Sequence, residues 1–459
     1  MDVKGKRVLV VGLGKSGVAS ALFLASRGAR VTVSDAKSED QLRTEIPALL
    51  DRGITVETGK HGERTFRDQD LIVVSPGVPG NVDPLQHARR LGIPVIGEIE
   101  LTARFLQGNI VAITGSNGKT TTTTLTGEII ASGGRKTLVG GNIGTPAITF
   151  VEQSSADTWV VLEISSFQLE SIETFRPHIS AILNVTPDHL DRHGSMENYI
   201  AAKTRIFENQ TADDFAILNS DNEICRGLAA GLKPQVLWFS RQHSVERGAF
   251  VQGSKIVYRN GSEVEIMPVS EIALKGAHNV ENVLAAVAIG MAAGVEPSSI
   301  RRAVKDFRAV EHRLEYVATL RGVQYYNDSK ATNVDATIKA LESFPANIHL
   351  ILGGKDKGND YSELAPLIAE RVKRVYTIGA AAAKIESQIG TAVPVISAQT
   401  LESAVRKAAD LATEGDIVLL APACASFDQF PNYEERGKVF KELVQSLAAL
   451  HSESPTGGR

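Results

Sequence analysis

Several kinds of residue and segment are scarce in this chain, and each scarcity excludes a class of protein. The only cysteines, Cys225 and Cys424, lie far apart, so we expect no disulfide framework and no cysteine metal site, as in a reducing cytoplasm. No basic block occurs and the net charge is −4, which argues against nucleic acid as a main partner.

Long hydrophobic runs are also missing. No apolar stretch reaches the roughly 18 residues that a membrane span needs. The first apolar segment breaks at Gly12, which is too early for a signal peptide. We therefore expect a soluble cytoplasmic protein that does not bind a membrane.

The length and composition indicate an ordinary globular protein with more than one domain. The chain has 459 residues, of which 43% are hydrophobic and 22% charged, and this length suits about three domains. The succession of motifs places the domain boundaries at 1–97, 98–310 and 311–459. Each unit is long enough to bury a core of its own.

The clearest motif lies at residues 110–121, where an apolar run leads into two glycines, a lysine and a run of threonines. Apolar residues at helical spacing follow, so the segment predicts a strand, a loop and a helix. Such a loop wraps polyphosphate, because its backbone N–H groups, the helix N-terminus and Lys119 attract phosphate oxygens, while Thr120 can ligate Mg²⁺. Ile113 stands where the usual pattern has a further glycine.

A second glycine-rich loop, with the pattern G-x-G-x-x-G at residues 12–17, follows the apolar strand at 7–11. Asp35 ends the next strand about 20 residues on, where an acid would bind a ribose hydroxyl. NAD, a UDP-type nucleotide and a merely structural turn all remain open for this loop, because every nucleotide diphosphate with a ribose presents the same groups. A nicotinamide dehydrogenase is the main alternative function.

Polar groups follow several strands of the central unit. Glu163 stands where a nucleotide-binding sheet needs an acid for Mg²⁺, and His189 follows the strand at 179–183. Lys203 lies on a mixed helix, so its surroundings in the sequence predict a solvated lysine. His278 and Asn279 open an alanine-rich helix, where capping alone would explain them.

The third unit again alternates strands with helices, which predicts a second doubly wound sheet. Its strand ends carry lysine, serine and threonine at 327–333, 353–357 and 423–428, which suits anionic groups. No hydride-transfer constellation is apparent. The fold class is therefore α/β in three domains: N-terminal Rossmann-like, central P-loop NTPase-like with a mostly parallel sheet, and C-terminal Rossmann-like.

These three binding units together favour carboxylate activation. ATP bound between two other substrates can phosphorylate a carboxylate, and an amine can then displace the acyl phosphate. A plain kinase would need only the central unit and an acceptor.

The chain resembles the Mur ligases of peptidoglycan synthesis over residues 1–450. The shared motifs lie at 114–121, 188–191, 202–203, 278–282 and 311–313, while 163–170, 327–333 and 421–429 are similar to the D-glutamate-adding branch. The resemblance implies an ATP-dependent ligase that joins D-glutamate to UDP-N-acetylmuramoyl-L-alanine through an acyl phosphate. It also implies two Mg²⁺ ions and a carbamylated Lys203, and we expect a monomer.

The resemblance further implies roles for individual residues. The catalytic residues would be Lys119, Glu163, His189 and Lys203. Thr120 and Glu163 would hold one Mg²⁺, and His189 with Lys203 the other. The ATP site would comprise Gly115, Asn117, Gly118, Lys119, Thr120, Thr121, Asn279, Asn282, Arg313 and Asp328. The UDP-sugar would contact Ser16, Asp35, Ser75, Gly77 and Asn142, and D-glutamate would contact Lys330, Thr332, Lys357, Ser426 and Tyr433.

Overall fold

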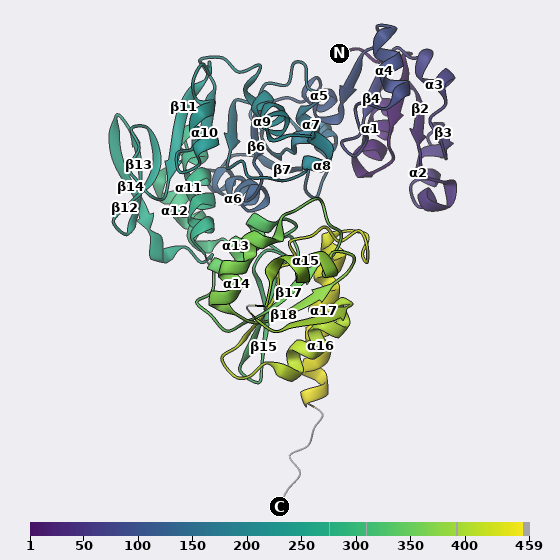
Figure 1. Ribbon diagram of the computed structural model, residues 1–459. Coiled ribbons are helices and arrows are strands. Elements are labelled where there is room, and N and C mark those ends of the chain that lie inside the picture. The colour runs from purple at the N-terminus through teal and green to yellow at the C-terminus, as the bar shows by residue number, and fades with distance from the viewer. Residues whose placement is uncertain (275, 309, 392, 453–459) are drawn as a thin grey trace, which may run out of the picture.

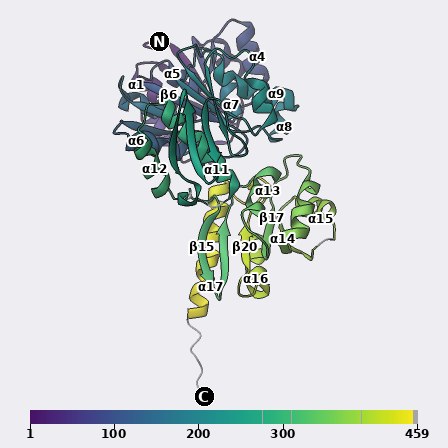
Figure 2. The ribbon, with the colours of Figure 1, turned by 90° about the vertical axis from the view of Figure 1, so that its left-hand side faces the viewer.

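The computed structural model describes residues 1–274, 276–308, 310–391 and 393–452. The described chain forms three sheets, of five, nine and six strands in chain order. In Figure 1 they form three bodies, the N-terminal one at upper right, the central one at upper left and the C-terminal one below. Figure 2 shows the C-terminal body projecting below the other two. None of the helices in the described part of the chain is long and apolar enough to cross a membrane.

The first sheet is entirely parallel, with the order β3-β2-β1-β4-β5. Its strands are β1 (Arg7–Val11), β2 (Arg30–Asp35), β3 (Thr55–Thr58), β4 (Leu71–Val74) and β5 (Val95–Gly97). Its helices are α1 (Lys15–Ser26), η1 (Glu39–Leu42), α2 (Ile46–Leu50), α3 (Glu63–Arg67) and α4 (Asp83–Arg90). Val8 and Val10 pack on one face of the sheet, and Leu9 and Val11 on the other, so helices bury both faces.

The central sheet has the order β14-β13-β12-β11-β10-β9-β6-β8-β7 and is parallel from β7 to β12. Its strands are β6 (Asn109–Thr114), β7 (Thr137–Gly141), β8 (Trp159–Glu163), β9 (Ile179–Ile182), β10 (Phe215–Asn219), β11 (Gln235–Ser240), β12 (Gly248–Gln252), β13 (Lys255–Asn260) and β14 (Ser262–Pro268). The last three strands form an antiparallel edge.

The helices of the central body cover both faces of that sheet. They are α5 (Glu98–Ala103), α6 (Lys119–Ser132), η2 (Ala147–Gln153), α7 (Ser166–Leu169), α8 (Leu190–His193), α9 (Met196–Thr204), η3 (Arg205–Phe207), α10 (Glu223–Leu228), η4 (Val269–Glu271), α11 (Ala277–Ala292) and α12 (Pro297–Asp306). Val111 and Ile113 of β6 pack with α6 and α11, whereas Ile110 and Ala112 pack with α7 and α9. The strand alternation thus produces two cores.

The C-terminal sheet has the order β15-β16-β20-β17-β18-β19, with only the β15–β16 pair antiparallel. Its strands are β15 (Glu315–Leu320), β16 (Val323–Asn327), β17 (Ile348–Gly353), β18 (Val372–Ile378), β19 (Val395–Gln399) and β20 (Ile417–Leu420). Its helices are α13 (Val334–Glu342), η5 (Tyr361–Leu364), α14 (Ala365–Arg371), α15 (Ala382–Ile389), α16 (Leu401–Leu411) and α17 (Tyr433–Ser452).

Strand order places the functional loops together. In the central sheet β6 lies between β9 and β8, and β7 follows β8, so the loops after these parallel strands leave from one edge. In the C-terminal sheet the neighbours β16, β20 and β17 likewise send their three loops from one edge. Ligands of open α/β sheets bind outside the carboxyl ends of the strands, and here two such edges face each other.

Candidate active site

The phosphate loop connects β6 to α6 and has a tight backbone. Gly118 caps the helix with φ of 83°, and a Cβ there would lie 2.1 Å from Oδ1 of Asn282, so only glycine fits. The Lys119 ammonium folds back over the loop and donates to the carbonyl oxygens of Gly115 and Ser116, each at 2.8 Å. Burial lowers the pKa of Lys119.

Behind this loop, Glu163 ends β8 with its carboxylate buried. Thr120 Oγ1 donates to Oε2 of Glu163 at 2.7 Å, and Asn142 Nδ2 donates to Oε1 at 2.9 Å. Burial alone would raise the pKa of Glu163, but Lys330 and Lys119 lower it overall, so the group is an anion. A carboxylate beside a threonine hydroxyl is the oxygen donor set that Mg²⁺ takes, so these residues fit the ion.

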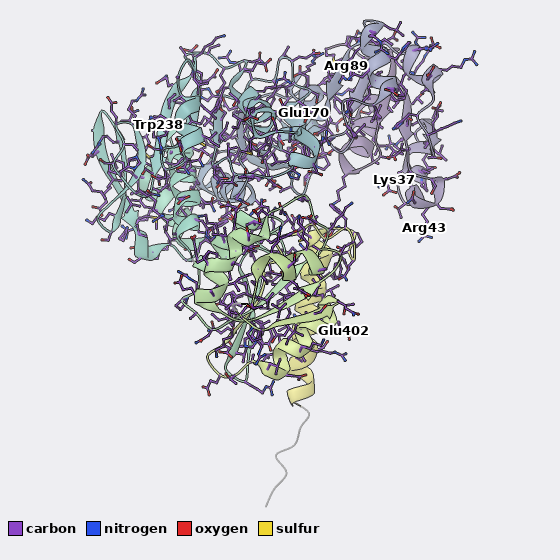
Figure 3. All side chains as sticks on the ribbon, in the orientation of Figure 1. Lys37, Arg43, Arg89, Glu170, Trp238 and Glu402 are labelled. Carbon is purple, nitrogen blue, oxygen red and sulfur yellow. The ribbon has the colours of Figure 1, made fainter. Side chains whose placement is uncertain are left out.

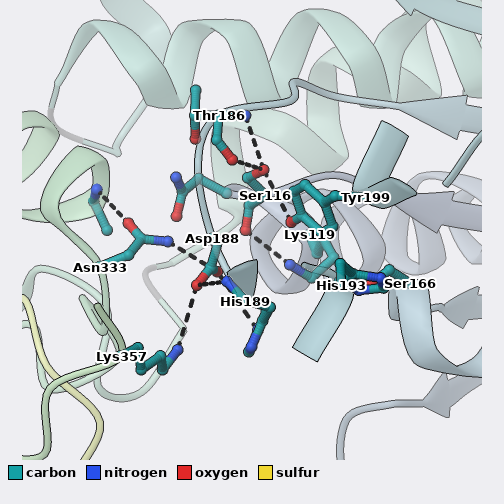
Figure 4. Close-up of polar contacts among 12 residues, drawn as sticks. Ser116, Lys119, Ser166, Thr186, Asp188, His189, His193, Tyr199, Asn333 and Lys357 are labelled. Atoms are coloured by element: carbon teal, nitrogen blue, oxygen red, sulfur yellow. Dashed lines mark hydrogen bonds and ion pairs between the residues drawn. The ribbon is translucent and has the colours of Figure 1, made fainter. Parts of the chain in front are cut away.

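The loop after β9 carries Asp188 and His189. Asp188 is buried, and its pKa is lowered by Lys357 against the effect of burial. Figure 4 shows Lys357 and Asn333 reaching this carboxylate from the C-terminal body, at 3.4 and 3.1 Å. Burial and nearby cations lower the pKa of His189 to about 4, which leaves a neutral imidazole with a free lone pair at neutral pH.

Lys203 contradicts the expectation of a solvated lysine. Its side chain is only 2% exposed, because α9 packs beneath the phosphate loop. Nζ donates to the carbonyl oxygen of Gly115 at 3.0 Å and lies 4.5 Å from the centre of the Tyr199 ring. The carboxylate of Asp188, whose charge acts on Lys203, pairs with Lys357 instead, at 3.4 Å. Burial and Lys119 hold its pKa well below the usual value, which favours the neutral amine.

A cavity of about 210 Å³ opens beside the phosphate loop, lined in part by Asn282, Arg313 and Asp328. Asn279 is buried and accepts a hydrogen bond at 3.0 Å from the lining residue Asn282. Burial raises the pKa of Asp328 to about 6. The explanation of His278 and Asn279 as caps is wrong, because Gly276 occupies the cap position and α11 already includes both residues.

A larger cavity of about 390 Å³ brings together the candidate residues of the central and C-terminal bodies. It is lined by Lys119, Asn142, Glu163, His189, Lys203, Arg313, Lys330, Thr332, Lys357, Ser426 and Tyr433, among others. Lys330 contacts Thr120 Oγ1 and donates to the Tyr433 hydroxyl at 3.1 Å. Burial lowers the pKa of Lys330 to about 8, so it is still a cation at neutral pH.

The candidate sugar-nucleotide residues of the first body lie at the carboxyl ends of β1, β2 and β4. Asp35 accepts hydrogen bonds from the backbone N–H groups of Leu13 and Lys37, at 2.7 and 2.8 Å. Ser75 Oγ donates to the Gly12 carbonyl at 2.8 Å, which ties the two loops together. Ser16 is half-buried and Gly77 is exposed. Of the five residues predicted for this ligand, Asn142 alone lines the larger cavity.

Sequence reasoning assigned no role to three residues that the fold brings into the site. Asp188, Asn333 and Asp335 join the central body to the C-terminal body, and Asp335 accepts from Asn117 Nδ2 at 2.6 Å. Asp188 stands next to His189 in the 188–191 motif, and a carboxylate beside that histidine is a sequence signal for a site residue. Asn333 lies in the 327–333 stretch and caps α13, but neither it nor Asp335 shows a local pattern that predicts its contact with the central body, because the partners lie far away in the sequence.

Three family models match the chain in order. A Mur ligase MurD-like N-terminal domain matches residues 6–97, a Mur ligase middle domain matches 113–290, and a Mur ligase glutamate ligase domain matches 312–424. The chain belongs to the Mur ligase family and is an ATP-dependent ligase, as predicted.

Two similar proteins carry the same name, UDP-N-acetylmuramoylalanine–D-glutamate ligase. The one from Koribacter versatilis is 69% identical over 449 residues, which cover 98% of this chain and 99% of that protein. The one from Acidobacterium capsulatum is 61% identical over 97% of each chain. The dehydrogenase alternative is not supported, since the segment with the first glycine loop matches a ligase domain.

Solved structures show the same fold at low identity. A pseudomurein peptide ligase type C from Methanothermus fervidus aligns with a TM-score of 0.63 at 19% identity, over 96% of this chain and 100% of that chain. The UDP-N-acetylmuramate-alanine ligase MurC from Thermotoga maritima aligns with a TM-score of 0.62, also at 19% identity and with the same coverage. The predicted three-part α/β architecture is confirmed.

Proposed function

We propose that this ligase adds D-glutamate to UDP-N-acetylmuramoyl-L-alanine and converts ATP to ADP and phosphate. The observation that carries the proposal is the larger cavity, where the phosphate loop, Glu163 and His189 of the central body face Lys330 and Lys357 of the C-terminal body. The names of the two similar proteins support the same substrates.

The reaction would take two steps. A carboxylate oxygen of the sugar nucleotide bonds to the γ-phosphorus as the bond to ADP breaks, which gives an acyl phosphate. The amine of D-glutamate then attacks the acyl carbon, the C–O bond to phosphate breaks and phosphate leaves. Lys119 would stabilise charge on the transferring phosphoryl group, and neutral His189 would accept or orient the proton of the amine whenever its lone pair is not bound to Mg²⁺. Enclosure by the three bodies would keep water from the acyl phosphate.

Metal binding would follow from the same side chains. Thr120 and Glu163 would hold one Mg²⁺, and His189 with a carbamylated Lys203 would hold the second. Bound Mg²⁺ supplies electrostatic stabilisation of phosphate charge. Carbamylation joins the neutral Nζ to the carbon of CO₂ and releases a proton, which turns Lys203 into an anionic oxygen ligand. The depressed pKa of the buried amine supports this step.

The remaining candidate residues divide among the substrates. We assign the adenine, ribose and γ-phosphate of ATP to Asn279, Asn282, Arg313 and Asp328, with the loop residues Gly115, Asn117, Gly118, Lys119, Thr120 and Thr121 on the phosphates. D-glutamate would contact Lys330, Thr332, Lys357, Ser426 and Tyr433, and the UDP-sugar would contact Ser16, Asp35, Ser75, Gly77 and Asn142. The enzyme would act as a cytoplasmic monomer with domains 1–97, 98–310 and 311–459, and its free buried Cys225 and Cys424 suit that compartment.

An acceptor screen tests the proposal. Phosphate release is measured with ATP and UDP-N-acetylmuramoyl-L-alanine, in the presence of D-glutamate, L-glutamate, L-alanine or meso-diaminopimelate. We expect release with D-glutamate, at a rate at least 10²-fold above the other amines. Equal release with another amine, or no amine-dependent release, would exclude the proposed substrate.

A further inference from the structure

Arg192 lies at the seam between the first and central bodies, directly after the loop that carries His189. Its Nη1 donates to the carbonyl oxygen of Pro76 at 3.1 Å, and its Nη2 donates to that of Val78 at 3.3 Å. Both acceptors belong to the loop after β4, which also holds Ser75 and Gly77. The Arg192 side chain of the central body is thus hydrogen-bonded to a loop of the first body.

Two residues of the central body, Phe167 and Glu170, hold the Arg192 guanidinium in place. It lies 4.0 Å from the centre of the Phe167 ring, and Nη2 pairs with Glu170 at 3.3 Å. Figure 3 places Glu170 on the side of the central body next to the first body. The Arg192 side chain is only 20% exposed, and a small cavity of about 90 Å³ runs along the seam beside it. A planar, stacked and paired guanidinium has little freedom left, so it can fix the loop that it contacts.

The Phe167 ring, which stacks on Arg192, also contacts the loop that carries His189. The Phe167 ring meets His189 edge-on at 4.9 Å and stacks on His193 at 5.3 Å. His193 in turn lies 2.9 Å from Ser166 Oγ. A rigid path therefore runs from the loop after β4, through Arg192 and Phe167, to His189.

We propose that Arg192 is a positioning residue for the sugar nucleotide. It sets the loop at 75–80 at a fixed distance from His189, so that the carboxylate of the bound substrate reaches the γ-phosphate. The inference rests on the proposed function, because it takes the sugar nucleotide to bind at Ser75 and Gly77. Arg192 would act on the substrate through this loop, because its guanidinium donates to the backbone of the loop and pairs with Glu170.

The test compares Arg192→Lys and Arg192→Ala with Arg205→Lys. Arg205 is a matched control, because it donates to the carbonyl oxygens of Leu169, Glu170 and Ile172, all within the central body. We expect Arg192→Ala to raise the KM for the sugar nucleotide about tenfold, because both hydrogen bonds to the loop are lost. Arg192→Lys should raise it about fivefold, because lysine keeps the charge but cannot donate from two nitrogens at once. The KM values for ATP and D-glutamate should change less than twofold.

Three outcomes decide the inference. A selective rise in the sugar-nucleotide KM for both Arg192 variants, absent in Arg205→Lys, supports it. Unchanged kinetics in an active enzyme would overturn it. A fall in kcat and thermal stability that matches Arg205→Lys, without a selective KM effect, would also overturn it and leave a structural role. If the wild-type enzyme itself shows no D-glutamate-dependent phosphate release, the proposed function fails instead.

Discussion

The two junctions of the central body are built from different chemistry. Toward the first body, the hydrophobic core is continuous: Val8 and Val10 of β1 share a cluster with Leu101 of α5 and Ile148 and Val151 of η2. Toward the C-terminal body, hydrogen bonds and an ion pair join polar groups, such as Asp188 with Lys357 and Asn117 with Asp335. The described hydrophobic clusters of the C-terminal body contain only residues from 314 onward.

This difference predicts that the junction with the C-terminal body is the mobile one. Separating a shared apolar core exposes hydrocarbon to water, at about 25 cal/mol for each Å². Polar contacts can exchange their partners for water at a much smaller net cost. We therefore expect the first and central bodies to move as one unit, while the C-terminal body opens to admit ATP and amine and closes for the reaction.

The largest expected effect on activity comes from Lys203, which lies at neither junction. Lys203→Ala should lower kcat about 10²- to 10³-fold, because it removes the proposed carbamate from the site without touching an interface. Added acetate or formate should restore part of the activity by supplying the lost carboxylate. Lys255→Ala is the matched control, since Lys255 is an exposed lysine of β13, in the antiparallel part of the central sheet. Full activity of Lys203→Ala would refute the carbamate.

Leu101→Ala should be the most destabilising change at the apolar junction. Leu101 is fully buried in the shared cluster, and truncation of such a leucine costs about 2–5 kcal/mol. Urea unfolding measures the loss, and Leu91→Ala, at a residue 54% exposed, should cost less than about 0.5 kcal/mol. A loss below about 1 kcal/mol for Leu101→Ala would mean that this junction already separates in solution.

Glu98 should make the apolar junction sensitive to pH. Burial raises the pKa of its carboxyl from 4.5 to about 7, so the folded state holds a proton that the unfolded chain releases. Stability is therefore lost as the pH rises from about 4.5 to 7, by roughly 3 kcal/mol in total.

The isosteric variant Glu98→Gln removes this proton linkage. It should be more stable than the wild type by roughly 3 kcal/mol at pH 8 and by less than about 1 kcal/mol at pH 5, as measured by urea unfolding. The same difference at both pH values would show that the carboxyl does not titrate in this window.

Asp335→Ala should have the smallest effect on activity and stability of the variants considered. It tests most directly whether the polar junction differs from the apolar one. Asp335 accepts from Asn117 at 2.6 Å and from Thr186 at 3.3 Å, so it links α13 to the phosphate loop across the polar junction. Loss of this link should raise the KM for ATP about threefold and change the free energy of unfolding by less than about 1 kcal/mol. A loss as large as that of Leu101→Ala would erase the distinction between the junctions.

The sequence predicted those parts of the site that are encoded locally. The phosphate loop, Glu163 at a strand end and the first glycine loop each follow a short pattern that fixes the backbone around it. Lys203 could not be placed in this way, because its burial depends on how α9 packs under Gly115 rather than on its neighbours in the chain. The link between Asn117 and Asp335 joins residues 218 positions apart and leaves no periodic signal.

The proposed mechanism depends above all on passage of the reaction through an acyl phosphate. Oxygen labelling tests this step directly. UDP-N-acetylmuramoyl-L-alanine labelled with ¹⁸O in its carboxylate is converted with ATP and D-glutamate, and the released phosphate is analysed by mass spectrometry. Formation of an acyl phosphate predicts that one labelled oxygen passes into each phosphate. Phosphate without the label would contradict the account.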